Sequence, residues 1–375
     1  MNIYGKNFSV RALRKHIGHM DQVAGVRLAQ LDDGRGRPAR AALFHTGAGL
    51  QFTVLLDRGM DISSASFQGR AMGWRSVVGD VAPQYFEPEG VRWLRSYSGG
   101  LVTTCGLTHV GGPDPDSAET GEGLHGRISH LPAENVAVRQ EWVKNDYVLR
   151  VTGTMRQAAV FGEHLTLTRT VWTRLGEKRF WIEDTVTNEG FSKTPLMLLY
   201  HCNIGWPAVG EGAEVLAPSR RVAPRDADAE DGKERWNKAE PPTHNWAEKV
   251  YYHDLQPGRK GQVTVGVVNK GFSRGEGFGV YITYNKKQLP RFVQWKQMGE
   301  QDYVMGLEPC NCGVEGPAAD RAAGLLHHLR AGESRRFDLE FGAVTTRGEQ
   351  AALRKAIGRT EPEFVDDYRV FVPKP

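Results

Sequence analysis

The sequence has few cysteines and no long hydrophobic run. Four cysteines in 375 residues are too few for a disulfide scaffold. No stretch approaches the roughly 20 consecutive apolar residues that a membrane-spanning helix needs. Residues 1–20 also lack the continuous apolar segment of a signal peptide. We therefore expect a cytoplasmic protein that does not bind membranes.

Strong charge and nucleotide-binding motifs are missing as well. The formal net charge is only +4, and the basic residues are dispersed along the chain, which argues against nucleic acid as a partner. There is no phosphate-binding GxxxxGK[ST] loop and no dinucleotide-binding glycine motif that opens a helix. The sequence therefore predicts no nucleotide cofactor. Its 40% hydrophobic and 25% charged residues are typical of a globular protein.

Alternating apolar and polar residues dominate the chain. This period of two is typical of strands with one buried face, and clusters of Gly, Pro, Asn and Asp separate the segments that show it. Helical periodicity appears only at residues 8–17 and 349–357. Many strands without interleaved helices predict an all-β fold of packed, mainly antiparallel sheets. The strand candidates are residues 25–30, 51–56, 135–143, 147–155, 164–172, 180–187, 262–268, 278–283, 292–296 and 336–344.

Residues 217–248 break this pattern. The segment contains four prolines, a charged run at 225–234 and few apolar residues. Irregular segments of this length inside a compact domain are usually functional lids or disordered excursions. Similar strand patterns lie on both sides, so we expect one domain over residues 1–375 with a mobile insertion at 217–248.

Two titratable residues each close an apolar strand in this sequence. His201 follows Leu198, Leu199 and Tyr200, and Glu308 follows residues 304–307. Burying such a side chain costs free energy unless the group is paired or used. A histidine and a carboxylate are the minimum requirement for general acid–base chemistry on a small polar substrate.

Two glycine-containing segments add candidate binding residues. The segment 57–62, Asp-Arg-Gly-Met-Asp-Ile, could form either a salt-bridged corner or a ligand-binding loop. In the segment 123–127, Gly-Leu-His-Gly-Arg, the glycines would let a ligand approach the backbone. If that segment is extended, His125 and Arg127 point to the same side and could bind sugar hydroxyls.

The cysteines lie beside these motifs, which raises the question of a metal. Cys202 follows His201, while Cys310 and Cys312 follow Glu308. The Cys-Asn-Cys spacing is tighter than that of the usual structural zinc pair, and no second pair exists. We expect these cysteines, with Cys105, to be small buried apolar residues rather than metal ligands.

Together these motifs resemble the aldose 1-epimerases, or galactose mutarotase-like proteins, and in particular a bacterial branch of that family. The resemblance extends over roughly residues 25–344. It rests on the segments 57–62 and 123–127, on Tyr-His-Cys-Asn at 200–203, and on Leu-Glu-Pro-Cys-Asn at 307–311, in this order. It implies a β-supersandwich with a sugar cleft.

The resemblance also implies roles for the residues. His201 would be the general acid and Glu308 the general base of an anomerisation that needs neither a metal nor another cofactor. Glu308 takes the anomeric proton, His201 protonates the ring oxygen, and the opened sugar recloses as the other anomer. The expected partner is a small-molecule carbohydrate. The residues expected to bind it are His125, Arg127, Asp57, Arg58, Asp61, Asn203 and Asn311.

Two other functions stay open at this point. The same acid and base could serve another carbohydrate isomerase, epimerase or lyase acting on a uronate or keto-sugar. A metal held by His125, His201, Glu308 or a nearby cysteine could assist such a reaction by polarising a carbonyl. Alternatively, the protein could bind or sense carbohydrate without turnover. The presence of both His201 and Glu308 argues against this second possibility, because binding alone does not need a matched acid and base.

Overall fold

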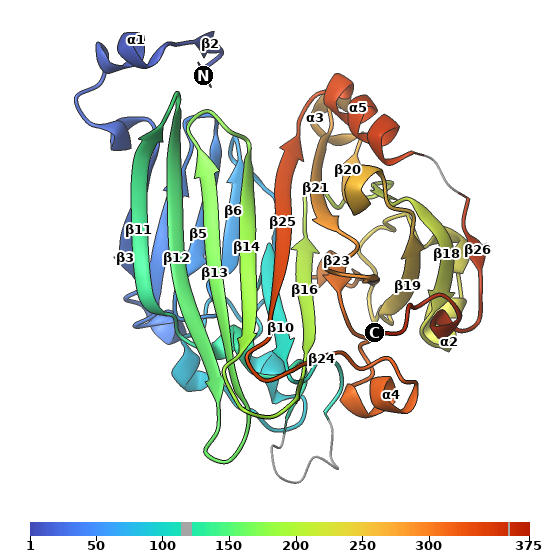
Figure 1. Ribbon diagram of the computed structural model, residues 1–375. Coiled ribbons are helices and arrows are strands. Elements are labelled where there is room, and N and C mark those ends of the chain that lie inside the picture. The colour runs from blue at the N-terminus through green and yellow to red at the C-terminus, as the bar shows by residue number, and fades with distance from the viewer. Residues whose placement is uncertain (114–121, 359–360) are drawn as a thin grey trace.

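Two large, mainly antiparallel sheets form the protein in a computed structural model that describes residues 1–113, 122–358 and 361–375 (Figure 1). The expectation of an all-β sandwich with mainly antiparallel strands is confirmed. The larger sheet contains, in spatial order, β26 (Glu363–Phe364), β18 (Ser219–Pro224), β19 (Lys249–Leu255), β22 (Arg291–Met298), β23 (Tyr303–Cys310), β16 (Met197–Ile204), β10 (Val102–Leu107), β6 (Asp61–Phe67), β5 (Leu50–Leu55), β4 (Arg40–His45) and β3 (Gly25–Gln30), with β7 (Arg70–Ala71) beside β6.

The smaller sheet has eight strands among the described residues. In order they are β11 (Glu134–Val143), β12 (Asp146–Ala158), β13 (His164–Arg174), β14 (Arg179–Asn188), β25 (Ser334–Val344), β21 (Phe278–Asn285), β20 (Gln262–Asn269) and β17 (Glu214–Leu216). Strands β11, β12, β13 and β14 are 10 to 13 residues long and pair in chain order. Three two-stranded pairs complete the strands: β1 (Asn2–Ile3) with β2 (Lys6–Asn7), β8 (Trp74–Arg75) with β9 (Gly99–Gly100), and β15 (Thr194–Pro195) with β24 (His328–Leu329).

Helices in the described residues are short. The sequence placed them at the chain ends, and α1 (Val10–Arg14) and α5 (Arg347–Ile357) lie there, but three more occur between strands: α2 (Ala227–Glu230), α3 (Phe272–Gly275) and α4 (Pro317–Ala322). The 3-10 turns are η1 (Met20–Gln22), η2 (Gly34–Gly36), η3 (Pro83–Tyr85), η4 (Arg92–Ser96), η5 (Ile128–His130), η6 (Lys233–Arg235), η7 (Arg259–Gly261) and η8 (Tyr368–Val370). Within the described ranges, no helix is both long and apolar enough to cross a membrane.

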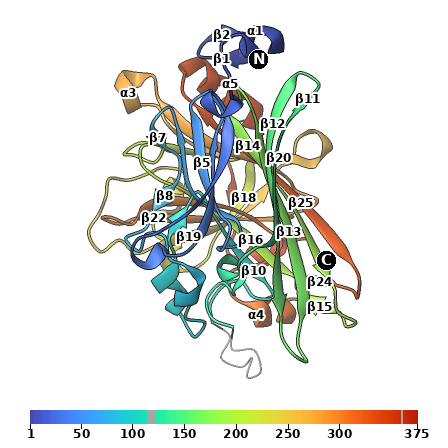
Figure 2. The ribbon, with the colours of Figure 1, turned by 90° about the vertical axis from the view of Figure 1, so that its left-hand side faces the viewer.

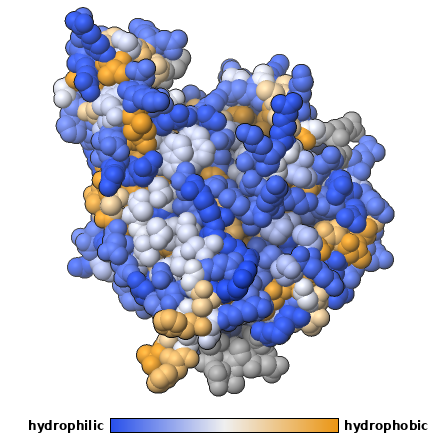
Figure 3. Space-filling model, viewed as in Figure 1, coloured by the Kyte–Doolittle hydropathy of each residue, from blue (hydrophilic) through white to orange (hydrophobic). Residues whose placement is uncertain are grey.

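The main core lies between the two sheets, which form separate layers in Figure 2. Phe52 of β5 stacks on Phe180 of β14 with a ring-centroid distance of 4.6 Å, and Phe180 stacks on Phe341 of β25 at 4.9 Å. The outer side of the smaller sheet is largely hydrophilic or intermediate in hydropathy in Figure 3. This arrangement explains the alternating sequence pattern, because strands such as β12 and β14 send every second side chain into the core.

The larger sheet packs a second apolar cluster on its opposite face. Alternation along β16 separates the two sides. Leu198 and Tyr200 belong to the core between the sheets, whereas Met197 and Leu199 belong to the second cluster, together with Trp74 and other side chains. His201 is therefore on the side of the second cluster, two positions from Leu199. Strands β16 and β23 are buried almost completely on both faces.

Residues 217–248 are more regular than the sequence suggested. The segment contains strand β18, helix α2 and turn η6, and it buries Val222, Ala229 and Trp236. The apolar residues were too sparse to show a period, but they pack against the neighbouring strand β19, which pairs with β18. That the segment moves on ligand binding stays a prediction.

Candidate functional site

A cavity of about 610 Å³ opens on the second-cluster side of the larger sheet, with His201 and Glu308 in its wall. These two residues come from neighbouring strands, β16 and β23, at the middle of the molecule in Figure 1. Both residues were expected at strand ends. Instead both lie within their strands, which continue past them and are buried on both faces. Aromatic side chains form much of the remaining wall: Trp74, Trp93, Tyr97 and Trp295.

His201 and Glu308 are in direct contact. Nε2 of His201 lies 3.2 Å from Oε1 of Glu308, and the residues are only 6% and 2% exposed. The contact lacks the alignment of a hydrogen bond, so Oε1 has no hydrogen-bond partner among the described residues. A buried carboxyl oxygen without a partner is costly. Glu308 borders the cavity, although Oε1 itself has less than 1 Å² of accessible surface.

Burial favours the uncharged form of both members of this pair. It lowers the pKa of His201 to about 4, although the hydrogen bond with Asn203 opposes this shift. Burial also raises the pKa of Glu308 well above its usual value, Glu248 raises it further and Arg225 lowers it. The sequence led us to expect an imidazolium beside a carboxylate near neutral pH. The structure instead favours a neutral ring beside a protonated carboxyl group, because desolvation penalises both charges.

His125 is the third polar side chain close to this pair. Its ring centroid is 5.8 Å from that of His201 and 5.0 Å from that of Trp93. The backbone N–H of Gly111 donates to Nδ1 of His125 at 3.3 Å. Burial, with smaller effects from His201 and His109, holds the pKa of His125 well below its usual value. Because Nδ1 accepts the hydrogen bond from Gly111, the ring hydrogen of a neutral His125 is on Nε2, which can donate to a ligand.

The segment around His125 is a turn rather than the extended segment we expected. His125 and Gly126 have φ values of 60° and 68°. A strand-like alternation therefore does not apply, and Arg127 does not line the cavity. Its Nε donates to Oε1 of Glu122 at 3.2 Å instead.

The segment 57–62 also lies outside the cavity wall and ties the fold together. Asp57 accepts hydrogen bonds from the backbone and side chain of Arg40. Arg58 is buried and donates to the backbone oxygens of Ser129, Ser96 and Val81. These contacts satisfy both side chains within the protein. The ion pair of Asp57 is thus with Arg40 rather than with Arg58, and a ligand-binding role of the segment stays a prediction.

Asp61 and the two asparagines are also engaged by protein groups. Asp61 accepts from Thr104 Oγ1 at 2.6 Å and from Arg169 Nη1 at 2.9 Å. Asn311 accepts from the backbone N–H of Leu198 and donates to the oxygen of Leu196, so it joins β23 to β16. Asn203 is 0% exposed and contacts His201. None of the three lines the cavity.

Further cavity residues escaped the sequence analysis. Arg225 donates to Oε1 of Glu248 at 3.0 Å, and Trp295 Nε1 donates to Oε2 of Glu248 at 2.7 Å. Arg225 begins the charged run noted in the sequence, and Trp295 lies in a predicted strand, but neither pattern indicates which side chains face a cavity. Trp93 lies in η4 and Tyr97 directly follows it, about 100 residues before His201 in the chain. No sequence pattern marked either residue as a candidate for the site.

The four cysteines are free and buried. Burial raises the pKa of each thiol, to about 12 for Cys310 and well above the usual value for Cys105, Cys202 and Cys312. Within residues 1–113, 122–358 and 361–375, no group of three or more His, Cys, Asp and Glu side chains is arranged to hold a metal ion.

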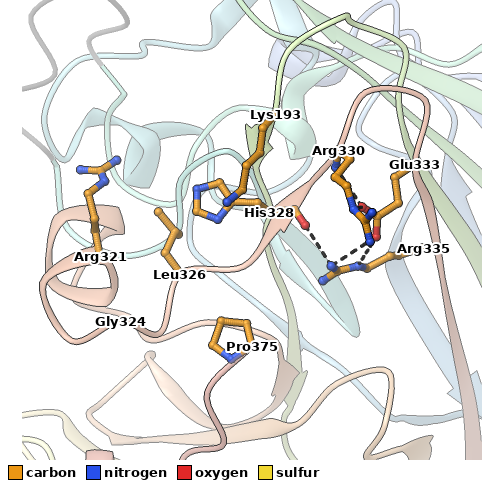
Figure 4. A pocket seen from close by; sticks show the side chains of 9 residues that line it. All are labelled: Lys193, Arg321, Gly324, Leu326, His328, Arg330, Glu333, Arg335 and Pro375. Atoms are coloured by element: carbon orange, nitrogen blue, oxygen red, sulfur yellow. Dashed lines mark hydrogen bonds and ion pairs between the residues drawn. The ribbon is translucent and has the colours of Figure 1, made fainter.

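A second pocket, of about 490 Å³, differs in character (Figure 4). Arg330 and Arg335 turn toward Glu333, while Arg335 also donates to the backbone oxygen of His328 at 2.9 Å. Its charged side chains are mostly cationic and lie at the surface. This pocket has no buried acid and base in contact, in contrast to the cavity at His201. Its lining is Lys193, Arg321, Gly324, Leu326, His328, Arg330, Glu333, Arg335 and Pro375.

Comparison with known proteins supports the fold. A family model described as "Domain of unknown function (DUF4432)" matches residues 36–343. A crystal structure of a candidate aldose 1-epimerase from Klebsiella pneumoniae is similar over 93% of both chains, at 25% identity and a TM-score of 0.86. No curated protein sequence matches significantly.

Two more distant structures share the architecture alone. A galactose mutarotase-like protein from Clostridium acetobutylicum is 10% identical, with a TM-score of 0.56 over 87% of this chain and all of the other. Galactose 1-epimerase from Lactobacillus acidophilus is 12% identical, with a TM-score of 0.51 over 86% of this chain and all of the other. The chain therefore has the galactose mutarotase-like fold that its motifs suggested.

Proposed function

We propose, from the premise that the chain belongs to the DUF4432 family, that it is a sugar-acting isomerase, and specifically an aldose 1-epimerase. The observation that carries this proposal is the contact between His201 and Glu308 in the wall of a cavity of suitable size. An acid and a base within 3.2 Å can act on two oxygens of one sugar ring, the anomeric hydroxyl and the ring oxygen. The name of the Klebsiella pneumoniae structure agrees with this assignment.

The pair holds one proton that it can exchange with a substrate. In the charged arrangement this proton is on His201 and the carboxylate of Glu308 is free. Glu308 removes the anomeric proton, His201 Nε2 protonates the ring oxygen, and the C1–O5 bond breaks to give an open-chain aldehyde. The pair is then neutral, with the proton on Glu308. Rotation about C1–C2 and reversal of both transfers give the other anomer.

Burial gives this cycle a specific energetic bias. The neutral pair, which the low-dielectric surroundings favour, is the state that accompanies the open-chain intermediate. The same surroundings favour the neutral pair before the sugar reacts, so ring opening from the charged arrangement first requires proton transfer from Glu308 to His201. Each positioned group typically contributes about 10²–10⁴-fold to the rate. Aromatic faces such as those of Trp74 and Trp295 offer apolar surface to the C–H groups of a sugar ring.

The decisive experiment is a direct measurement of anomer exchange. Freshly dissolved pure anomers of neutral aldoses, uronates and keto-sugars are followed by polarimetry or by NMR exchange spectroscopy, with and without protein. We expect catalysed exchange for at least one sugar, which Glu308→Gln abolishes. Glu183→Gln is the matched control, because Glu183 lies on the outer face of the smaller sheet, where it accepts from Trp172.

The same screen separates the other functions. Binding of a sugar without faster anomer exchange would replace the enzyme by a binding protein. Formation of a new sugar or an unsaturated product, visible in the same NMR spectra, would assign a different reaction to the pair. Loss of activity with a chelator, restored by a divalent ion, would establish a metal-assisted reaction.

A further inference from the structure

Asn203 lies beneath His201 in a buried hydrogen-bonded arrangement. The two residues are two positions apart on β16, so their side chains lie on the same face of the strand. Asn203 Oδ1 is 2.6 Å from His201 Nδ1, and Asn203 Nδ2 donates to the backbone oxygen of His201 at 3.0 Å. With no exposed surface, Asn203 has no access to water and must satisfy its amide within the protein.

The orientation of this amide is determined by its other neighbours. The hydroxyl of Tyr97 donates to Oδ1 at 2.8 Å. Burial raises the pKa of Tyr97 well above its usual value, so the phenol keeps its proton. A reversed amide would place its oxygen against the carbonyl oxygen of His201 and its NH₂ group against the ring. The described contacts therefore favour an oxygen that faces Nδ1.

An amide oxygen only accepts hydrogen bonds, so Nδ1 must carry a hydrogen. We infer that Asn203 and Tyr97 are positioning residues that hold His201 in the Nδ1–H tautomer and reserve Nε2, the nitrogen facing Glu308, for proton transfer. The tautomer follows from the contacts alone. The catalytic consequence rests on the proposed function.

The choice of an amide rather than a carboxylate has a further consequence. A carboxylate at this position would stabilise the imidazolium and raise the pKa of His201. The neutral oxygen of Asn203 orients the ring without adding charge, so a protonated His201 remains a strong enough acid to protonate a ring oxygen. Tyr97 supports this arrangement through its stacking on Trp93, at a centroid distance of 4.4 Å.

The test is NMR of the histidine ring nitrogens in the full-length protein without substrate. The signals of His201 are assigned by their loss in His201→Asn. In the wild type we expect a protonated Nδ1 and an unprotonated Nε2 at neutral pH. Asn203→Leu should give mixed tautomers, Tyr97→Phe a smaller change of the same kind, and Asn203→Asp a pKa of His201 raised by about one unit or more.

Control variants test whether the changes in the His201 signals are specific to Asn203. The other titratable groups that face His201 are Glu308 from β23, His125 from its turn and Tyr97 itself, and Asn203→Leu and Asn203→Asp leave all three in place. Asn188→Leu removes a buried asparagine that donates to backbone oxygens in another part of the fold, so it should lower stability without moving the His201 signals. An Nε2–H tautomer in the wild type would overturn the inference, whether or not the variants fold.

Kinetics separate this inference from the proposed function. If the protein anomerises a sugar, Asn203→Leu should lower kcat about 10–100-fold with KM little changed. Active protein with the opposite tautomer would refute the positioning role alone. The expected tautomer in a protein that turns over no sugar would refute the proposed function and leave the positioning role intact.

Discussion

The two sheets treat polar residues differently. In the smaller sheet, burial alternates along strands such as β14; many polar side chains lie on its outer face, and the buried Asp184 is paired with Arg169 of β13. In the larger sheet, β16 and β23 are buried on both faces and still contain His201, Asn203 and Glu308. Alternating burial is therefore typical of a sheet whose role is to cover the core with one face. Polar residues inside a strand buried on both sides indicate a group that is either paired or used.

Arg169 and Glu308 show how a paired buried charge differs from a used one. Arg169, on β13, is fully buried and donates to Asp184, Asp61, Thr104 and the backbone oxygen of Gly59, so its charge is balanced and its donors are occupied. Glu308 is equally buried, yet Oε1 has no hydrogen-bond partner among the described residues. The structure satisfies Arg169 internally, whereas Glu308 borders the cavity with Oε1 buried and unpartnered among the described residues.

The largest effect on stability should come from the paired charge. Arg169→Met leaves Asp184 and Asp61 buried without their cation, which should lower the free energy of unfolding by about 3–5 kcal/mol. Urea denaturation followed by tryptophan fluorescence measures this. Arg336→Met, at an exposed ion pair of the smaller sheet, should cost less than about 1 kcal/mol. Equal losses in both variants would remove the distinction between the two kinds of arginine.

Glu308, the group that we propose to be catalytic, should affect activity more than stability. Glu308→Gln should lower kcat at least about 10²-fold with little change in KM. Burial raises the pKa of folded Glu308, so the native state keeps a proton that the unfolded chain releases above its pKa of about 4.3. The wild type therefore loses stability as the pH rises toward the folded pKa.

Glutamine cannot ionise, so Glu308→Gln does not share this loss. Relative to the wild type, the variant should be more stable at pH 8 than at pH 4, as measured by thermal unfolding at both values. Near-native turnover in this variant would make Glu308 a structural residue and contradict the proposed function.

Activity should depend on pH as a property of the pair. Burial lowers the pKa of His201 to about 4, so below that value the pair binds a second proton and loses its base. kcat should fall about tenfold per pH unit below about 4, stay level through neutrality, and fall again where the pair loses its exchangeable proton. A chelator should leave this profile unchanged. A requirement for a divalent ion, lost in His201→Asn, would assign His201 to a metal instead.

The smallest effect should come from the outer face of the smaller sheet. Thr152 and Thr170 face each other on β12 and β13 with their hydroxyl oxygens 2.9 Å apart. Thr152→Ala should cost about 0.2–1 kcal/mol and leave activity unchanged. A loss of activity here would mean that the supporting sheet is coupled to the cavity, and the contrast between the two sheets would fail.

The sequence predicted the supporting sheet well, because alternation is a local signal. The predicted strands at 135–143, 164–172 and 180–187 all lie within β11, β13 and β14. The segment 57–62 shows where local reasoning stopped. Asp57, Arg58 and Asp61 look the same in sequence whether they bind a ligand or other parts of the chain. Tertiary packing supplies their partners from other elements, such as Arg40 of β4, Arg169 of β13 and Ser129 of η5.

The sequence by itself determined the all-β class and named His201 and Glu308, because a titratable residue in an apolar run stands out locally. The tertiary structure decided which groups surround that pair. Strand pairing brings Glu308 next to His201 across about 100 residues, and loop packing brings Tyr97 to Asn203 from a similar distance. It also decided the charge of the pair, since desolvation depends on burial by the whole fold, which no local pattern records.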